Sequence, residues 1–391
     1  MALLQPTLAV TAVPPGTWSI PAEGHARRVR TLRREVHRIA DEVIDAGTFH
    51  FGPQTARLEQ RIATSWGGSA VATTSCTQAL TLALRVAGVR PGDEVVLPAA
   101  TFAATAFAVC ETGAVPVIVD VAEPSLTLCP QALRAAVTPR TRAVIPVHLH
   151  GHMADMPQIL SVGREHGLAV VEDCAQAAGA ALDGRAAGTW GDFGCFSFWV
   201  GKCVGGLADG GAVVTDSAER ADRLRRLTDM GRERGQRHVH HDRGARARLG
   251  ELDAGLIALE LERQPAWLAR RSAIASHYSE AFADLPIVPP QVLPGYQHAY
   301  YKYAVACPDP VGLGLFLAAR GIETEQVYPY LLPDQPAFRH IEYRSRVTSR
   351  SAGAARRLCL PAYAELSDAE VERVALAVRD FATGATGRKA R

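Results

Sequence analysis

Lys202 and Asp173 are the two side chains whose types and positions in this sequence suggest chemistry. Lys202 follows the apolar and aromatic stretch from Phe196 to Val200, and Asp173 closes the apolar run that begins at Leu168. A lysine amine just after one strand, with a carboxylate at the end of another, is what a pyridoxal phosphate enzyme needs. The amine would form a Schiff base with the cofactor aldehyde, and the carboxylate would keep the pyridine nitrogen protonated. The pair predicts pyridoxal phosphate chemistry, although Asp173 alone is equally well explained as a helix N-cap.

A short polar segment between Thr73 and Thr77 could bind a phosphate. It follows an apolar run and precedes the helical pattern from Ala79 to Leu84, which puts Ser75 and Cys76 at a helix N-terminus. Free N–H groups and the helix dipole both favour an anion at such a position. The same residues are also ordinary helix caps, and a cap needs no ligand.

Three further side chains belong to the same predicted site. Ser197 precedes Lys202 by five residues and could give a second hydroxyl to the phosphate. Phe102 could stack on the pyridine ring, and Gln176, three residues after Asp173, could lie beside the ring hydroxyl. A single aromatic of this kind is more often part of a core, and a single glutamine is more often solvated. As a set, these positions are better explained by one cofactor site.

The first two thirds of the chain alternates short apolar runs with helical patterns. This alternation is typical of a mainly parallel sheet covered by helices on both faces. Ligands of such sheets bind outside the carboxyl ends of the strands, where Asp173 is expected. Strands are predicted at Ala70–Thr73, Glu94–Leu97, Val115–Val119, Arg142–Val147, Leu168–Glu172, Gly194–Phe198 and Gly211–Thr215.

The pattern changes at about Glu251, where leucines recur at helical spacing and Pro265 interrupts a long helix. We expect this helix to link two domains, and Ser367 to Glu370 to open a last helix as a capping box. The predicted organisation is an N-terminal arm and helix over residues 1–47, a large cofactor-binding domain over 48–250, and the linking helix with a small domain over 251–391.

The composition is typical of a globular protein, and it favours an enzyme that acts on small molecules. Of the 391 residues 48% are hydrophobic and 21% charged, and the net charge of +2 gives no basic footprint for nucleic acid. The segment Met1 to Pro14 lacks the layout of a secretion signal, and no apolar run is long enough to span a membrane. The eight cysteines are scattered without a CxxC pair. We therefore expect a cytoplasmic protein without a nucleic-acid or membrane partner.

Two histidine-rich pieces look like metal sites, from His148 to His152 and from His238 to His241. Alternating histidines can share one face of an extended segment, but no third anchor at a ligand spacing accompanies either piece. We expect no metal, with His148 lining the active site and the later cluster in a solvated loop.

The segments just described belong to a wider set of motifs. They are Gly52-Pro53, Ser75 to Leu80, Pro98 to Thr105, Gly113 to Val117, Val171 to Ala177, Ser197 to Lys202, Gly210 to Thr215, Gly321 to Thr324 and Tyr328-Pro329. In these motifs the chain resembles the DegT/StrS family of pyridoxal phosphate-dependent sugar aminotransferases, from about Phe51 to Phe381. The resemblance implies an α/β protein with the aspartate aminotransferase fold (type I). Such a fold has a large domain on a mainly parallel seven-stranded sheet and a smaller α+β C-terminal domain.

The resemblance also implies roles for single residues. Lys202 would be the Schiff-base lysine and the acid and base, and Asp173 the partner of the pyridinium. The other cofactor contacts implied are Gln176 near the ring oxygen, Phe102 over the ring, and Ser75, Cys76, Thr77 and Ser197 around the phosphate. Substrate contacts are expected from His148, Arg248 and Tyr328. The family usually works as a homodimer in which the other subunit completes each active site.

Two departures from the family pattern concern the phosphate. Cys76 stands where the family usually has glycine, so its side chain could crowd the cofactor or shift the turn. Arg246 stands where the family usually has an asparagine that reaches the partner subunit's phosphate. An arginine could still serve there, as a charged bidentate donor.

The predicted reaction is a transamination. Glutamine or glutamate would convert pyridoxal phosphate to pyridoxamine phosphate, and the amine would then pass to a keto-cyclitol or keto-sugar in secondary metabolism of the aminoglycoside type. The segments from Val147 to Met156 and from Gly184 to Thr189 resemble the branch of the family that acts on keto-cyclitols such as scyllo-inosose. The alternatives are a nucleotide-keto-sugar acceptor, a pyridoxal phosphate-dependent sugar dehydratase, against which the presence of Lys202 argues, and a catalytically silent partner or regulatory protein.

Overall fold

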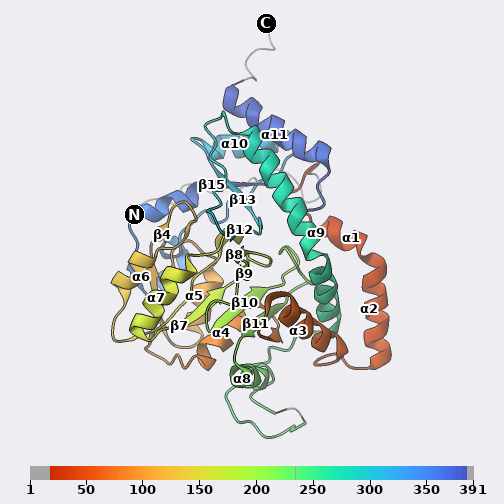
Figure 1. Ribbon diagram of the computed structural model, residues 1–391, viewed down its shortest axis with the longest axis vertical. Coiled ribbons are helices and arrows are strands. Elements are labelled where there is room, and N and C mark those ends of the chain that lie inside the picture. Colours follow the sequence, from red (N-terminus) through yellow and green to blue (C-terminus); the bar gives the residue numbers. More distant parts are fainter. Residues whose placement is uncertain (1–17, 234, 385–391) are drawn as a thin grey trace.

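The computed structural model describes residues 18–233 and 235–384, and most of them are organised around one eight-stranded sheet (Figure 1). The strand order is β1 (Ser69–Thr73), β11 (Gly211–Thr215), β10 (Phe193–Ser197), β7 (Ala169–Asp173), β6 (Thr141–Val144), β2 (Glu94–Pro98), β3 (Val115–Val119) and β14 (Arg344–Arg346). β11 runs antiparallel to both of its neighbours, and all other pairs are parallel. All seven predicted strands are present in this mixed sheet.

The eighth strand, β14, was not predicted. It lies far along the chain, after most of the C-terminal segment, and pairs in parallel with β3, with Arg344 opposite Val117 and Arg346 opposite Val119. Its sequence Arg-Ser-Arg has no apolar run because the strand is at an exposed edge. The seven-stranded sheet that the family resemblance implied is therefore extended by one short strand, and a segment expected in the small domain adds to the large sheet.

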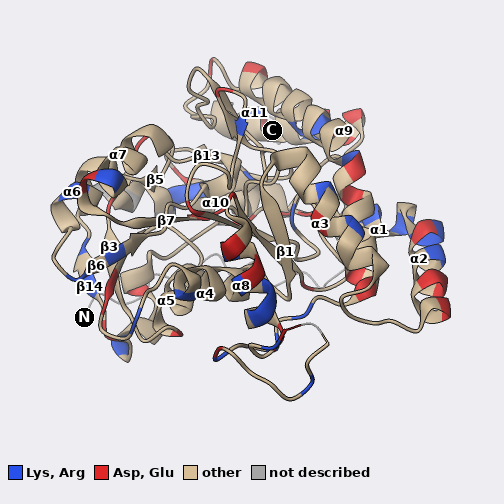
Figure 2. Cartoon of the chain, turned by 60° about the horizontal axis from the view of Figure 1, so that its bottom comes forward, with Lys and Arg blue, Asp and Glu red and all other residues tan. Residues whose placement is uncertain are grey.

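The sheet is buried on both faces because its strands are almost wholly apolar. Successive residues of β2 point to opposite sides, so that Val96 enters one core and Val95 and Leu97 enter the other. The core on one side includes residues of α3, α6, α7 and α9, and the core on the other side includes residues of α4, α5 and α8. Figure 2 shows the strands mostly free of charged residues, whereas α2, α8 and α9 carry many of both signs.

Six helices supply most of the helical residues in the two cores beside the sheet. Their bounds are α3 (Pro53–Trp66), α4 (Cys76–Val86), α5 (Ala103–Cys110), α6 (Pro130–Ala136), α7 (Met156–His166) and α8 (Ala218–Thr228). Short two-residue strands complete the loops: β4 (Val121–Ala122), β5 (Thr127–Leu128), β8 (Ala181–Leu182), β9 (Arg185–Ala186) and β12 (Tyr296–Gln297). The 3₁₀ turns are η1 (Leu149–Gly151), η2 (Leu332–Asp334), η3 (Pro336–Arg339) and η4 (Ser349–Arg356).

The C-terminal part has a core of its own, reached by the 31-residue helix α9 (Glu251–Ala281) with Pro265 inside it. One side of this core is the antiparallel pair of β13 (Tyr303–Ala306) and β15 (Arg357–Leu360). The other side is formed by the helices α10 (Pro310–Ala318) and α11 (Asp368–Thr383). The predicted capping box is present: the Ser367 hydroxyl accepts from the Glu370 amide, and the Glu370 carboxylate accepts from the Ser367 amide.

The N-terminal part of the described chain lies against α9. Helices α1 (His25–Thr31) and α2 (Arg33–Ala46) run beside it in Figure 1, and Ile20 enters the C-terminal core. Residues 1–17 of the predicted N-terminal arm lie outside the described residues. Among the described residues, none of the helices combines the length and the apolar character that crossing a membrane requires.

Candidate active site

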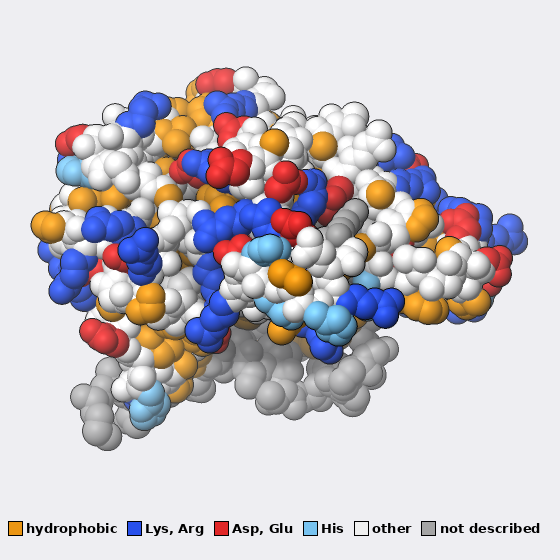
Figure 3. Space-filling view, turned by 90° about the horizontal axis from the view of Figure 1, so that it is seen from below, with side chains coloured by type: hydrophobic (Ala, Val, Ile, Leu, Met, Phe, Trp, Pro, Cys, Tyr) orange, Lys and Arg blue, Asp and Glu red, His pale blue; other side chains and the backbone are white. Residues whose placement is uncertain are grey.

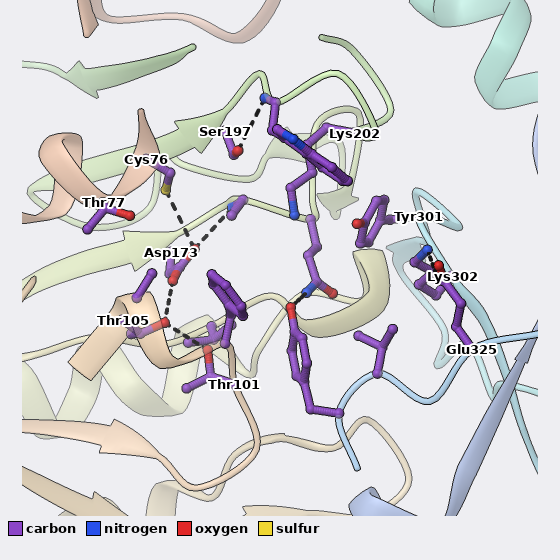
Figure 4. A pocket seen from close by; sticks show the side chains of 18 of the residues that line it. Cys76, Thr77, Thr101, Thr105, Asp173, Ser197, Lys202, Tyr301, Lys302 and Glu325 are labelled. Atoms are coloured by element: carbon purple, nitrogen blue, oxygen red, sulfur yellow. Dashed lines mark hydrogen bonds and ion pairs between the residues drawn. The ribbon is translucent and has the colours of Figure 1, made fainter. Parts of the chain in front are cut away.

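One cavity of about 700 Å³ lies at the carboxyl ends of β7 and β10 and brings most of the predicted residues together (Figure 4). Its other walls come from the start of α4, the start of α5, the residues just before β13, and the segment 324–329. Nine of the twelve residues singled out from the sequence line it: Ser75, Cys76, Thr77, Phe102, Asp173, Gln176, Ser197, Lys202 and Tyr328. The other three, His148, Arg246 and Arg248, are not among the residues that line it.

Asp173 is the last residue of β7, and its carboxylate is fixed by two donors. Oδ2 accepts from the Thr105 hydroxyl at 2.8 Å and Oδ1 from the Ala175 amide at 3.1 Å. Thr101 lies one helical turn before Thr105 and bonds its hydroxyl at 2.8 Å. Burial raises the pKa of the Asp173 carboxyl, and the bonds from Thr105 and Ala175 oppose that shift. The carboxylate is therefore held in one orientation toward the cavity.

Lys202 reaches the same cavity from the loop between β10 and β11. Its Nζ lies 4.4 Å from the centre of the Tyr301 ring, and no carboxylate of the described residues is within salt-bridge distance of it. Burial lowers the pKa of the Lys202 amine, although Cys76 and Asp173 oppose this. A larger fraction of the amine is therefore uncharged, which is the form that can act as a nucleophile or accept a proton.

The segment predicted to bind a phosphate forms the start of α4, as expected. Ser75 is the N-cap of this eleven-residue helix, and its Oγ accepts from the Gln78 amide at 3.2 Å. Gly211 of β11 passes so close that a Cβ on it would lie 2.4 Å from the Ser75 carbonyl carbon. Thr77 and Ser197 face the cavity at the same end. Hydroxyls, amide groups and a helix N-terminus thus converge there.

Cys76 occupies this turn without disrupting it. Its side chain is buried, with Sγ 3.3 Å from the Cys195 carbonyl oxygen and 3.8 Å from Asp173 Oδ1. Burial raises the pKa of the thiol, and Asp173 adds to the shift. The thiol group therefore stays protonated beside the Asp173 carboxylate, and α4 keeps its N-cap with a cysteine in place of glycine.

Gln176, Tyr328 and Phe102 form the opposite wall. Gln176 Nε2 donates to the Tyr328 hydroxyl at 2.8 Å, and its Oε1 accepts from the His150 amide at 2.6 Å. The Phe102 ring is 60% exposed and lies 5.7 Å from the Tyr328 ring, centre to centre. Phe102 is thus an exposed aromatic at a cavity rim and not a core residue.

His148 does not line the cavity, contrary to the prediction. It is fully buried, and its Nε2 lies 2.9 Å from a carboxylate oxygen of Glu172 while its Nδ1 accepts from the Ala154 amide at 3.0 Å. The Glu172 oxygens also accept from the amides of Gly188, Trp190 and Gly191. Both ring nitrogens are therefore used inside the protein, which leaves His148 no lone pair for a substrate or, together with Glu172 and Cys174, for a metal ion.

Arg246 and Arg248 lie away from the cavity of their own chain. Arg246 is exposed and its backbone bridges to Asp229, at the end of α8. Arg248 Nη1 lies 3.7 Å from an Asp229 carboxylate oxygen. The preceding residues 235–244 project from the bottom of the molecule in Figure 1.

Several residues of the cavity were missed by the sequence analysis. The largest group surrounds Lys302, whose Nζ pairs with Glu23 at 2.8 Å and with Glu325. Thr105 and Tyr301 were also missed. The spacing of Thr101 and Thr105, one turn apart at the start of a helix, was the only local signal. Glu23, Lys302 and Glu325 come from distant segments, so no local pattern could connect them.

Comparisons with known proteins agree with this geometry. The sequence model that describes the DegT/DnrJ/EryC1/StrS aminotransferase family matches residues 31–379 of this chain. UDP-N-acetyl-3-dehydro-alpha-D-glucosamine 3-aminotransferase of Acidithiobacillus ferrooxidans is 37% identical over 89% of this chain and 94% of its own. The dTDP-3-amino-3,4,6-trideoxy-alpha-D-glucose transaminase of Streptomyces venezuelae is 38% identical over 90% and 93%.

A solved structure gives the same result for the fold. The crystal structure of S. venezuelae DesV in complex with a ketimine intermediate superposes with a TM-score of 0.89 at 38% identity, covering 93% of this chain and 98% of that one. The expected α/β fold of the pyridoxal phosphate-dependent aminotransferases is confirmed. The chain belongs to the DegT/DnrJ/EryC1/StrS aminotransferase family.

Proposed function

We propose that this aminotransferase moves an amino group from glutamate or glutamine to the ketone of a nucleotide-linked keto-sugar, with pyridoxal phosphate as its cofactor. The observation that carries the proposal is the shared cavity of Lys202 and Asp173, an amine of lowered pKa and a fixed carboxylate. Between them, a pyridoxal ring would have its nitrogen toward the acid and its aldehyde toward the amine.

The donor set fits that cofactor. Asp173 would bind the ring nitrogen, and the hydroxyls of Ser75, Thr77 and Ser197, with the amides at the start of α4, would hold the phosphate. Phe102 would cover the ring, and Cys76 would lie beside Asp173 beneath it. Gln176 Nε2 gives only one of its two N–H groups to the Tyr328 hydroxyl, so the second could donate to the ring oxygen while both internal hydrogen bonds are kept.

When bound, pyridoxal phosphate supplies a ring that accepts electrons from the substrate carbon. The protein supplies the proton transfers. The uncharged Lys202 amine would take the proton from the carbon of the donor and return one to the cofactor, and the reverse sequence would deliver the amine to the acceptor. Asp173 would keep the ring nitrogen protonated throughout, because Thr105 and Ala175 fix its carboxylate.

The acceptor proposed here is the alternative of the sequence analysis, not its main prediction. The relatives described above are named for UDP- and dTDP-linked sugars, which supports a nucleotide-keto-sugar over a keto-cyclitol. A keto-cyclitol in aminoglycoside-type biosynthesis has no such support. A role in antibiotic biosynthesis is supported by the name of the erythromycin biosynthesis sensory transduction protein EryC1 of Saccharopolyspora erythraea, which is 38% identical over 78% of this chain.

A homodimer with shared active sites is part of the proposal. Arg246 is exposed and outside its own cavity, where a phosphate contact in a second subunit would place it. The segment before it carries exposed side chains, Arg237, His238, Val239, His240 and His241, and Figure 3 shows basic side chains and histidines gathered on this lower face.

The cytoplasm is the compartment that we propose for this protein. Its eight cysteines are all unpaired, which fits a reducing compartment.

Absorbance spectroscopy tests the reaction. Protein loaded with pyridoxal phosphate is expected to lose the visible band of the lysine-bound cofactor on addition of glutamate or glutamine. Addition of a nucleotide-keto-sugar to the resulting pyridoxamine form should restore the band, and a keto-cyclitol should not. A cofactor that binds but responds to no amino donor would instead favour the silent or regulatory alternative. Loss of water from the sugar without amine transfer would favour the dehydratase.

Mixing two inactive variants tests the dimer. Lys202→Ala and Arg246→Ala chains, co-refolded, form a mixed dimer in which one site has both natural residues and the other has neither. About a quarter of the wild-type activity is expected from random pairing if the sites are shared. No recovery would contradict the sharing.

A further inference from the structure

The loop that carries Lys202 has no secondary structure of its own to hold it. It connects β10 to β11, and between residues 200 and 207 its internal backbone bonds are few, such as the Lys202 amide to the Trp199 carbonyl at 2.8 Å. The ends of the loop are joined by backbone bonds from the Val200 amide to the Ala208 carbonyl at 2.9 Å and from the Gly206 amide to the Phe198 carbonyl at 2.8 Å. Side chains of α1 and α9, two helices distant in sequence, also bond the backbone of the loop.

Arg28 of α1 supplies the first set of contacts. Its Nη1 donates to the Lys202 carbonyl at 2.8 Å, and its Nη2 donates to the Val200 carbonyl at 2.5 Å. The guanidinium is only 4% exposed and lies 5.5 Å from the ring centre of Trp267 on α9. A buried arginine whose planar fork bridges two carbonyls of one loop fixes the path of that loop, because both donors must move together.

Two carboxylates of α9 supply the second set. Glu260 is fully buried, its Oε1 lies 3.0 Å from Arg28 Nε, and its Oε2 accepts from the Gly205 amide at 2.8 Å. Asp253, two helical turns earlier, accepts from the Leu207 amide at 2.7 Å. Two carbonyls of the loop are thus held by Arg28, and two amides near its end are held by carboxylates of α9.

We propose that Arg28 is a positioning residue for Lys202, and that the Arg28–Glu260 ion pair fixes the loop 200–205 so that the lysine amine faces Asp173 across the cavity. The inference rests on the proposed function only in taking Lys202 as the residue that carries the cofactor. It makes the N-terminal helix α1 part of the active site, although none of its residues lines the cavity.

The physical reason is the steep dependence of such chemistry on placement. Lys202 is long and flexible, so its amine is located only as well as its backbone is. A buried ion pair adds little net stability, but removal of one partner leaves an unpaired charge. The pair therefore contributes a defined loop position more than folding free energy, and a shift of about 1 Å in a reacting group can cost about 100-fold in rate.

The variants must separate positioning from stability. Arg28→Met leaves Glu260 buried without a cation and could simply unfold the protein, so the informative variant is the double change Arg28→Met with Glu260→Met. It replaces the pair by apolar side chains of similar size, which preserves folding in known cases. It leaves the two loop carbonyls without their donor and the Gly205 amide without its acceptor. Arg28→Lys keeps a cation opposite Glu260 and loses the fork. Arg30→Met is the matched control, because Arg30 is exposed on the same helix and bonds only within it.

Hydrogen–deuterium exchange of the loop is the first measurement, made on cofactor-loaded and cofactor-free protein. The amides of residues 202–207 are expected to exchange at least about tenfold faster in the double variant and in Arg28→Lys than in the wild type and Arg30→Met. Wild-type exchange in either Arg28 variant would overturn the proposal. This measurement needs no substrate, so it remains valid if the proposed reaction fails.

The reaction of Lys202 with the cofactor is the second measurement. Borohydride reduction after mixing with pyridoxal phosphate, followed by peptide mass spectrometry, gives the rate at which Lys202 becomes labelled. The double variant should melt near the wild-type temperature, label about tenfold more slowly, and show a fall in kcat of about 100-fold with little change in KM for glutamate. The double variant could instead combine wild-type stability with a wild-type rate of Lys202 labelling and a wild-type kcat. Arg28 would then serve only to stabilise the fold, and the proposal would be overturned.

Discussion

The Lys202 and Lys302 amines both lie near the same Tyr301 ring, at 4.4 and 4.9 Å from its centre, yet they have opposite electrostatic environments. Burial lowers the pKa of Lys202, which has no carboxylate bonded to its amine. Burial acts on Lys302 in the same direction, but Tyr301, Glu325 and Glu23 outweigh it and raise its pKa. The first amine is available for proton transfer, and the second is a fixed cation.

This difference shows that burial alone does not decide the role of a lysine. Two carboxylates convert Lys302 into a structural joint between the N-terminal segment, the residues before β13 and the segment 324–329. Their absence at Lys202 leaves an amine whose charge depends on its neighbours, including the positive charge of Lys302 itself, which further lowers the Lys202 pKa.

Lys202→Ala tests the difference most severely. Loss of the amine removes both the covalent attachment point and the acid and base, so kcat is expected to fall at least about 1,000-fold. The visible absorbance band of the bound cofactor should be lost, while the melting temperature changes little. Lys302→Met is the matched change and should retain the band; a band retained in Lys202→Ala would mean that another amine carries the cofactor.

Asp173→Asn has the next largest expected effect. The amide keeps the shape of the carboxylate and can still accept from Thr105, but it cannot hold a proton on the ring nitrogen by charge. We expect kcat for the glutamate half-reaction to fall about 100-fold or more, with weaker cofactor binding. Stopped-flow absorbance measures the half-reaction. Near-normal kcat would remove Asp173 from the proposed mechanism.

Lys302→Met should shift a pH profile instead of abolishing activity. Removal of a nearby positive charge raises the Lys202 pKa, so a higher pH is needed to release its proton. The pH at half-maximal labelling of Lys202 by pyridoxal phosphate should therefore move upward from the wild-type value. Glu23 and Glu325 lose their partner, at a cost of about 1–2 kcal/mol of unfolding free energy because both are partly exposed. A downward shift would contradict the assigned coupling.

Tyr301 gives the smallest expected effect and the sharpest control. Tyr301→Phe keeps the ring between the two amines, and the rate of Lys202 labelling should stay within about threefold of wild type. Tyr301→Leu removes the ring that stabilises the Lys202 ammonium, so the pKa of this amine should fall and the pH at half-maximal labelling should move downward. Equal effects of the two changes would assign the role to the hydroxyl and not to the ring.

Seven of the eight strands of the large sheet, and the shared location of Lys202 and Asp173, could be predicted from the sequence. Apolar runs bounded by turns predicted seven strands because those strands are buried on both faces, and Asp173 was recognised because it ends one of them. β14 escaped because an edge strand of Arg-Ser-Arg has no pattern. The prediction that His148 lines the site was wrong, because its ring bonds Glu172 of the neighbouring strand β7. The spacing of residues in the sequence does not show toward which face of the sheet a histidine points.

The long-range ion pairs could not be predicted from the sequence either. Arg28 and Glu260 lie on two helices that meet only after folding, and Lys302 finds Glu23 and Glu325 in segments before and after it. No periodicity or motif links such residues. The roles of Arg246 and Arg248 also stay predictions, because they concern a second subunit.

The pairing of β14 with β3 has a consequence for anyone who cuts this chain into pieces. A fragment ending near residue 250 would contain the other seven strands of the eight-stranded sheet. It would leave β3 as an unpaired edge strand, with amides and carbonyls free to bond a neighbouring molecule. Such a fragment is expected to self-associate, whereas one that extends past Arg346 closes its own border. A segment of the C-terminal third thus covers one edge of the sheet that carries Asp173.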